Sequence, residues 1–309
     1  MSQYIFVWIL QLVAVPMLAP LGVGLIDTLK ARFQRKQGPG VLQTYRNLWK
    51  LFHKDEVVSK DVSFIFRWAP YILFATTLIV GASIPIFTIV LSSPMSDLLV
   101  VIYILTLGVF FMALAGMDSG SAFGGFGSSR EMTLSALTEA ALIFSILSVA
   151  FISGTTNITD IAAGVSMDGN IFLIPVILAS VGFMIALLAE TSRYPFDNPA
   201  THLELTMIHE AMLLEYSGKR LALMEWAAAN RLLIFSLLLV NLFFPFGIAH
   251  AVTFGSIVLG IGAVLVKLMV VYVIVAFIES LIAKYRFFRL PDILLVSFVL
   301  NVVAIGLTL

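Results

Sequence analysis

Cysteine is absent from the 309 residues of this chain, and its absence removes several kinds of redox chemistry. Disulfides, thiolate ligands for iron–sulfur clusters and thioether links to haem all require cysteine. The four histidines are scattered, and no apolar segment holds the pair that a bis-histidyl haem b needs. We therefore expect no cofactor in this chain, and we expect electrons to travel elsewhere.

Charged residues are also scarce. They make up 12% of the chain, against 60% apolar residues and a mean hydropathy of +1.04, whereas a soluble domain is about one quarter charged. Because so few charges cannot cover a surface that faces water, most of the surface must face lipid. The formal net charge is zero, and no nucleic-acid partner is expected.

The chain contains long apolar segments. Eight segments reach the roughly 20 residues that a spanning helix needs, and all must be helical because lipid offers the peptide groups no hydrogen-bond partner. The first segment lacks the preceding basic residues of a secretory signal, so we interpret it as a retained helix. The sequence predicts an all-α polytopic membrane protein, with 1–309 as one integral membrane domain. The predicted spans are 4–26, 69–91, 98–117, 132–153, 170–190, 230–250, 257–282 and 292–309.

The distribution of Lys and Arg gives the orientation, because cytoplasmic connections are rich in basic residues. Of the 18 basic residues, all but Lys267 lie in or beside alternate connections, of which 27–68 and 191–229 are the longest. The intervening connections, 92–97, 154–169 and 251–256, contain none. We therefore place the basic connections in the cytoplasm and both termini outside.

The cytoplasmic connections have features that suit the docking of another protein. In 41–52, apolar residues recur at helical spacing with Arg46 and Lys50 opposite, which predicts an amphipathic helix at the membrane surface. The Gly-rich stretch 118–129 (DSGSAFGGFGSS) is predicted to be an irregular loop. The segment 191–229 is the longest polar stretch, and we expect it to form a cytoplasmic loop.

Two ionisable side chains lie well inside predicted spans, where an ion costs at least ~2.5–3.5 kcal/mol. They are Glu139 and Lys267, and they form either a buried structural pair or part of a proton relay. Acids nearer the cytoplasmic ends of spans either reach the interface with their side chains or join that relay. These acids are Asp27, Glu131 and Glu190, with Glu279 in the inner part of the seventh span.

The segment 191–229 is rich in acids. Clustered carboxylates raise each other's pKa, so some of them can exchange protons near neutral pH. The alternative is a solvated acidic loop whose charge is balanced by Arg193, Lys219 and Arg220. His202 and His209 are seven residues apart and would share a helix face, but their spacing matches no metal motif, so no metal site is predicted. The acids are Asp197, Glu204, Glu210, Glu215 and Glu225.

Several motifs resemble a known family. Residues 190–197 (ETSRYPFD), followed by Glu204 and by 215–218 (EYSG), resemble the signature loop of the NADH-ubiquinone oxidoreductase chain 1 family, a membrane component of respiratory complex I. Residues 35–40 (RKQGPG) resemble the first cytoplasmic loop of that family. Residues 114–121 (LAGMDSGS), with 127–131 (GSSRE), are more similar to the branch found in membrane-bound group 4 [NiFe] hydrogenases, which includes formate hydrogenlyase and hydrogenase-4. The resemblance covers essentially the whole chain.

The resemblance implies partners and a location. The chain would anchor hydrogenase-like large and small soluble subunits, which would carry iron–sulfur clusters and, in the hydrogenase branch, a NiFe centre. It would adjoin antiporter-like membrane subunits in the inner membrane of a prokaryote. Quinone is a possible ligand. However, the positions three and five residues after Asp197, where the family usually has acids, hold Ala200 and His202, and the stretch between Glu204 and Glu215 is about three residues longer than usual. These departures weigh against a quinone chamber.

The residues and the resemblance together give two sets of candidate site residues. For a proton path they are Glu139, Glu190, Asp197, Glu204, Glu210, Glu215, Lys267 and Glu279, and for the docking loops they are Arg35, Gly38, Pro39, Asp118, Arg130, Glu131, Arg193 and His202.

The predicted function is a membrane anchor and proton-coupling subunit of a respiratory-type oxidoreductase complex, without a catalytic centre of its own. Three alternatives stay open: a quinone-chamber subunit, a scaffold with no transport role, and a free-standing ion transporter. The last is disfavoured because the sequence has no inverted repeat. Silent carboxylate substitutions would favour the scaffold.

Overall fold

The computed structural model describes residues 2–88, 96–167, 174–197, 207–249 and 253–308, and the helices account for most of them. Within these ranges the only β pairing consists of two isolated bridges. Among the described residues, seven helices are long and apolar enough to cross a membrane, and the shorter apolar helix α7 falls where the fifth span was predicted. The all-α polytopic prediction is therefore confirmed. The helices are α1 (Ser2–Phe33), α2 (Gln43–Phe52), α3 (Phe64–Ser83), α4 (Leu98–Asp118), α5 (Ala122–Ser153), α6 (Ile158–Met167), α7 (Ile174–Glu190), α8 (His209–Leu213), α9 (Gly218–Leu242), α10 (Phe254–Leu281) and α11 (Leu290–Gly306), with a 3₁₀ turn η2 (Phe287–Arg289) before α11.

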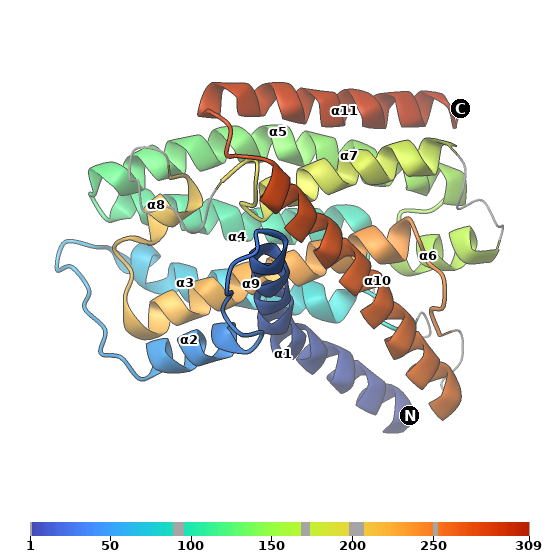
Figure 1. Cartoon of the computed structure of the whole chain (residues 1–309), viewed down its shortest axis with the longest axis horizontal. Helices are drawn as coiled ribbons and strands as arrows, with labels where there is room; N and C mark the ends of the chain where they lie inside the picture. Colours follow the sequence, from blue (N-terminus) through green and yellow to red (C-terminus); the bar gives the residue numbers. More distant parts are fainter. Residues whose placement is uncertain (1, 89–95, 168–173, 198–206, 250–252, 309) are drawn as a thin grey trace.

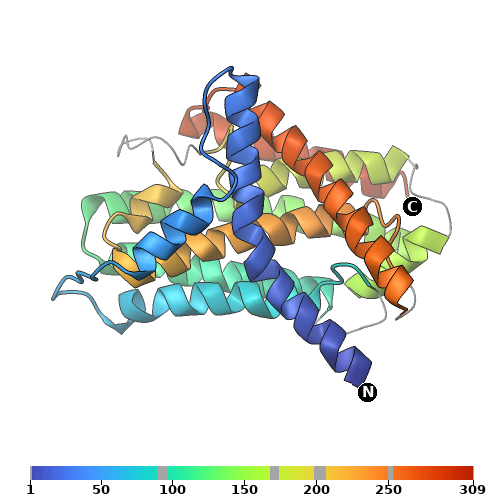
Figure 2. The same ribbon diagram turned by 60° about the horizontal axis from the view of Figure 1, so that its bottom comes forward.

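The long helices form a bundle around α9. Helices α3, α4, α5, α7, α9 and α11 lie roughly side by side, whereas α1 and α10 cross the bundle obliquely (Figure 1). Figure 2 shows α1 running across the other helices at a steep angle. Helix α9 packs against α1, α2, α3, α6, α7 and α10, and α5, α7 and α11 pack against one another. Almost every residue of α9 after its first turns is buried for that reason.

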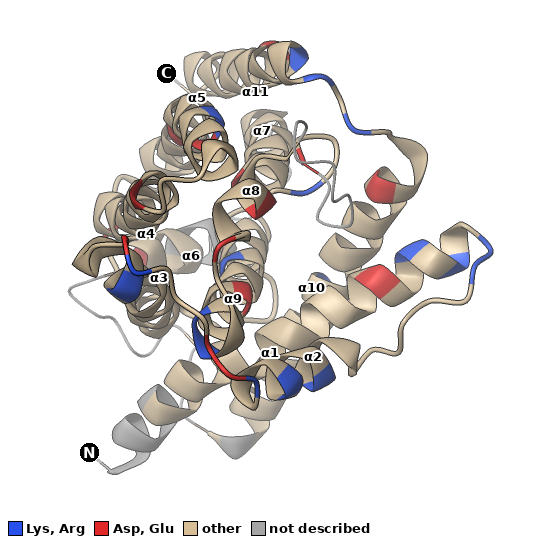
Figure 3. Cartoon of the chain, turned by 90° about the vertical axis from the view of Figure 1, so that its left-hand side faces the viewer, with Lys and Arg blue, Asp and Glu red and all other residues tan. Residues whose placement is uncertain are grey.

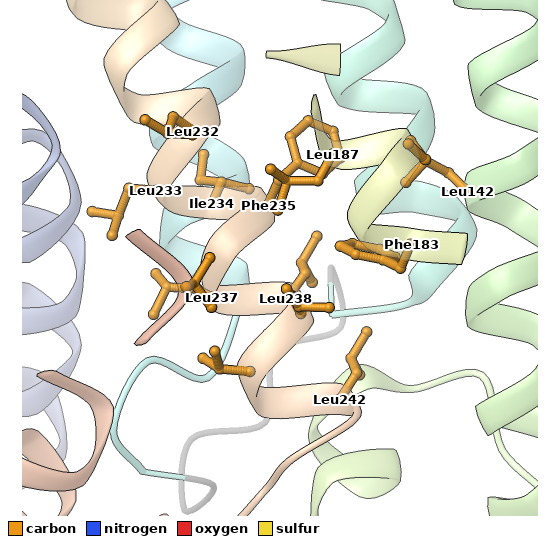
Figure 4. Close-up of a cluster of buried hydrophobic side chains, with 14 of the residues drawn as sticks. Leu142, Phe183, Leu187, Leu232, Leu233, Ile234, Phe235, Leu237, Leu238 and Leu242 are labelled. Atoms are coloured by element: carbon orange, nitrogen blue, oxygen red, sulfur yellow. The ribbon is translucent and has the colours of Figure 1, made fainter. Parts of the chain in front are cut away.

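The centre of the bundle is filled by aliphatic and aromatic side chains. Phe183 and Leu187 of α7 face Phe235 and Leu238 of α9, with Leu142 of α5 beside them (Figure 4). Lipid is as apolar as these side chains, so close packing and hydrogen bonds, rather than exclusion of water, must hold the helices together. Small residues at helix contacts make that close packing possible.

The connections meet at two ends of the bundle. At one end, which we call the charged end, Asp118 accepts hydrogen bonds from Ser63, and Arg220 pairs with Glu56. Figure 3 looks onto this end, where blue and red segments mark the charged residues of several helices and connections. At the far end, which also holds both termini (Figure 1), the connection after α3 forms one isolated bridge with the connection after α5 and one with the connection after α9. The connections therefore sort into the two groups that the basic residues predicted.

The prediction of an irregular loop at 118–129 is wrong. Helix α5 begins at Ala122, and only a short turn separates it from α4. The glycines serve close packing instead: a Cβ on Gly124 would lie 2.4 Å from the carbonyl oxygen of Gly116, and one on Gly127 would lie 2.8 Å from the Cβ of Ala211. A Gly-rich sequence can therefore be a helix whose neighbours approach its backbone.

Other boundaries also differ from the predictions. Helix α9 begins at Gly218, twelve residues before the predicted span at 230, so 191–229 contains α8 and the charged first turns of α9. Helix α6, at the far end, was not predicted. The amphipathic helix at 41–52 is confirmed as α2, but its Trp49 is 70% exposed and points away from the buried face that holds Leu48.

Candidate functional site

A buried carboxylate at the charged end joins three segments. Glu279, near the end of α10, accepts from Lys30 Nζ of α1 at 2.9 Å and from Arg193 Nη1 at 3.2 Å, and its side chain is fully buried. Asp27 of α1 lies 3.9 Å from the same Arg193 nitrogen. The Lys30 ammonium also lies 4.5 Å from the centre of the Tyr194 ring. This network fixes the segment after α7 against α1 and α10.

Asp197 organises the continuation of that segment. One carboxylate oxygen accepts from Lys284 Nζ at 2.5 Å, and the other accepts from the backbone N–H groups of Ile208 and His209 at 3.2 and 3.1 Å. Two N–H groups at the start of the short helix α8 therefore converge on one buried oxygen. Tyr285 N–H donates to the Pro195 carbonyl at 3.1 Å, so the connection between α10 and α11 is held against the same segment.

A third set of ionisable groups lies deeper in the bundle. Glu190, the last residue of α7, pairs with Arg231 of α9, and both side chains are buried. Glu190 also lines a small cavity together with Glu139 of α5. The hydrogen bond that Glu139 accepts comes from Ser135 Oγ at 3.2 Å. Glu139 is therefore close to the charged end but has no ion pair with Lys267, so the suggested structural pair is not formed.

His209 lies beside acids of two helices. Its Nδ1 is 4.0 Å from Glu131 Oε1 of α5, at the limit of an ion pair, and Glu210 is its neighbour in α8. Burial and the nearby Arg231 act to lower the pKa of His209, but the negative charges of Glu131 and Glu210 outweigh them and raise it above its usual value. The acids around His209 therefore favour its protonated ring.

These networks surround one polar cavity of about 310 Å³ at the charged end. Its wall contains more acids than bases, and the acids come from α1, α7, α8, α9 and the segment after α7. Because Glu190 also lines the cavity that contains Glu139, it connects the polar cavity with the interior of the bundle. The ionisable lining residues are Asp27, Glu190, Arg193, Asp197, His209, Glu210, Glu225 and Arg231.

The residues predicted for docking are distributed over the same end. Asp118 accepts from the N–H groups of Ser63 and Phe66 and fixes the start of α3. Arg130 donates to the Met207 carbonyl at 3.0 Å. In the segment after α1, Thr28 Oγ1 donates to the Pro39 carbonyl at 2.8 Å, and Arg35 has a left-handed φ of 54°. A Cβ on Gly38 would lie 2.5 Å from that of Ala31, so the segment turns back closely along α1.

Not every candidate is part of this cluster. Lys267 binds Asn241 and Phe244 near the other end of α9, and Glu215 is exposed outside the cavity. Glu204 and His202 lie outside the described residues. Within the described ranges no group of three His, Asp or Glu residues could hold a metal ion.

Sequence reasoning did not select several members of the cluster. Lys30, Arg231 and Lys284 were used to orient the chain, yet each pairs with one of the acids that were predicted. A usable signal existed, because a buried acid at a helix end requires a basic partner on the same side of the membrane. The sequence does not tell which base belongs to which acid.

Comparison with known sequences identifies relatives along the whole chain. A family model described as NADH dehydrogenase matches residues 5–309. The hydrogenase-4 component C of Escherichia coli is 36% identical over 298 residues, which are 95% of this chain and 92% of that protein. Formate hydrogenlyase subunit 4 of the same organism is 32% identical over 276 residues, or 89% of each chain.

Comparison with solved structures supports the fold. A chain of the membrane-bound sulfane sulfur reductase, an archaeal respiratory membrane complex, superposes with a TM-score of 0.83 over 100% of both chains. The two sequences are 20% identical, so this likeness concerns the arrangement of the helices alone.

Proposed function

This chain belongs to the NADH dehydrogenase family, and from that premise we propose that it is the membrane subunit that anchors the soluble redox arm of a hydrogenase-type respiratory complex and couples it to proton translocation. The relatives from hydrogenase-4 and formate hydrogenlyase support this branch of the family. The observation that carries the proposal is the polar cavity at the charged end, where five carboxylates meet two arginines and one histidine.

In this proposal the charged end faces the cytoplasm of a prokaryotic inner membrane. The basic residues gather there, as the positive-inside rule requires. The soluble arm would bind over α2, α8 and the segment after α1, and would carry the iron–sulfur clusters and the NiFe centre. The membrane subunits beside this chain would be antiporter-like and would receive the protons.

The proposed proton path runs from the polar cavity into the bundle. Glu190 lines both the polar cavity and the cavity with Glu139, so a proton that reaches Glu190 has a second carboxylate nearby at greater depth. Reduction of a centre in the docked arm would add negative charge near the cavity and strengthen proton binding by its carboxylates. Arg231 would favour the return of Glu190 to its ionised form, because the two side chains pair.

The test is Glu139→Gln in the whole complex. Gln keeps the shape of the side chain and can still accept the hydrogen bond from Ser135, but it cannot carry a proton. In inverted membrane vesicles we expect electron transfer to continue while proton uptake is lost. The matched control is Glu215→Gln, since Glu215 is exposed and lies outside the cavity. Full proton uptake by an intact Glu139→Gln complex would refute the path.

A quinone-chamber function is the second candidate, and one observation favours it. A second cavity of about 310 Å³ lies between α1, α9 and α10 and is lined only by apolar side chains, among them Val15, Leu237 and Leu268. It could hold the apolar tail of a quinone. Leu237→Trp would fill the cavity, so this candidate predicts that the variant loses labelling by a photoreactive quinone while Glu139→Gln keeps it.

A further inference from the structure

Lys267 is separated from all the other basic residues of this chain. It lies halfway along α10, which has 28 residues, and is therefore roughly 20 Å from either end of the helix at about 1.5 Å per residue. Its Nζ donates to Asn241 Oδ1 and to the Phe244 carbonyl, both at 3.2 Å. These oxygens at the end of α9 are neutral, so they bind the ammonium without balancing its charge.

No carboxylate pairs with Lys267 in the part of the chain that the structure describes. The basic residues buried at the charged end behave differently, since Arg193 pairs with Glu279 and Arg231 with Glu190. Ionised side chains within membrane spans are costly and normally pair with one another. A charge within a span that is only hydrogen-bonded therefore indicates a partner outside the chain.

The surface beside Lys267 is open in the isolated chain. Val266 and Val270, which flank it on α10, are 66% and 54% exposed. Of the described helices, α10 packs against α1 and α9, and its outer side forms an edge of the bundle in Figures 1 and 2. A second transmembrane helix can therefore approach the ammonium along α10.

We propose that this face of α10 binds a transmembrane helix of a neighbouring membrane subunit, and that an Asp or Glu of that helix forms an ion pair with Lys267. A transmembrane helix fits the apolar residues that flank Lys267, Val266 and Val270, better than a polar lipid headgroup does, and a lipid adduct is an outcome of the test below. The proposal rests on the proposed membership of a multi-subunit membrane complex.

Cross-linking of the assembled complex tests the contact without disturbing the lysine. Because the sequence contains no cysteine, Val270→Cys introduces a single thiol that can carry a photoreactive benzophenone. We expect it to join α10 to a peptide of another membrane subunit that contains an Asp or Glu within a transmembrane segment. The matched control is Val299→Cys on the exposed face of α11, which should not label that peptide. Adducts with lipid alone would overturn the proposal.

Charge substitution tests the ion pair itself. In Lys267→Met we expect the amount of the neighbouring subunit that co-purifies in mild detergent to fall about tenfold or more, equivalent to about 1.4 kcal/mol, while Lys267→Arg retains it. Full retention in Lys267→Met would refute the pair. Asp168, between α6 and α7, lies outside the described residues, and the same loss in Asp168→Asn would show that the partner is internal and would also refute it. If Lys267→Met removes the chain from the membrane, the cross-link decides.

This outcome is independent of the proton path. A Glu139→Gln complex that still pumps protons but contains the Val270 cross-link would refute the path and support the docking face. Loss of proton pumping in Glu139→Gln without a cross-link from Val270→Cys would support the path and refute the docking face.

Discussion

The charged end and the interior of the bundle are held together by different chemistry. At the charged end, Glu279 lies between Lys30 and Arg193, and full charges pair. In the interior, neutral groups bond to backbone carbonyls: Asn301 Nδ2 donates to Ala141 O at 2.8 Å, and Ser297 Oγ donates to Gly182 O at 2.7 Å. The difference shows how depth in the membrane selects the kind of polar contact.

The energetic reason is the cost of ions in lipid. An ionised side chain at the bilayer centre costs at least ~2.5–3.5 kcal/mol, whereas a neutral hydrogen bond between helices contributes about 0.6 kcal/mol on average. Neutral contacts are individually weak, so the interior also depends on small residues that let helices approach. Buried ion pairs near the interface fix the positions of their helices more strongly. Removal of one partner is strongly destabilising, because the other charge is left buried without a counter-ion.

Removal of the Glu279 charge should have the largest effect. Glu279→Gln leaves Arg193 and Lys30 without their shared buried counter-ion, and breaking a buried ion pair in this way costs about 3–5 kcal/mol. We expect the segment after α7 to detach from α1 and α10. Thermal unfolding in detergent and limited proteolysis near Arg193 will measure the loss.

The control for Glu279→Gln is Glu215→Gln, which removes an exposed carboxylate at the same end. Its melting temperature should stay close to that of the wild type, because exposed charges contribute little to stability. Equal melting temperatures for Glu279→Gln and Glu215→Gln would contradict the prediction. They would show that the buried ion pairs of Glu279 add no more to stability than an exposed charge does.

The variant Gly182→Ala tests the packing of the bundle interior, and we expect an intermediate loss of stability. A Cβ at this position would lie 2.1 Å from Asn301 Oδ1, so Gly182→Ala must displace the side chain that donates to Ala141 O. Overpacking of this kind costs about 1–3 kcal/mol, and we expect a lower melting temperature in detergent. Gly262→Ala is the control, because nothing lies within 4 Å of its Cβ position. An unchanged Gly182→Ala protein would show that α7 and α11 do not need this close contact.

Composition and charge predicted the fold well, because the bilayer sets the length of the apolar segments and the side on which basic residues gather. Length and hydropathy located eight apolar helices, and the basic residues sorted the connections into two groups that the structure also shows. The prediction failed at Gly124 and Gly127, since a Gly-rich sequence serves a turn or a close helix contact equally well. Only the neighbouring helices, α4 for Gly124 and α8 for Gly127, decide between them.

The sequence identified many of the charged residues at the charged end, but not which acid pairs with which base. Motifs and acid clusters selected Glu190, Arg193, Asp197 and Glu279, which the structure brings to one end of the bundle. Their basic partners depend on the crossing angles of α1, α9 and α10, which no local pattern contains. Glu139 and Lys267 were considered as a pair because both lie inside spans, but Glu139 accepts from Ser135 and Lys267 donates to Asn241.

His209 offers the smallest effect and a test of its sign. Its pKa in the folded chain is raised above the ordinary value, since Glu131 and Glu210 outweigh the opposing effects of burial and of Arg231. The protonated ring therefore adds stability that is fully present below about pH 6.5, the usual pKa of histidine, and is lost as the pH rises through the folded-state pKa. We expect the melting temperature of wild type minus that of His209→Gln to be largest near about pH 6 and to shrink at higher pH. His53→Gln, at an exposed position of the same end, is the matched control. A difference in melting temperature that grows with pH would contradict this expectation. It would mean that the folded chain prefers the neutral ring of His209, so that Glu131 and Glu210 do not stabilise its protonated form.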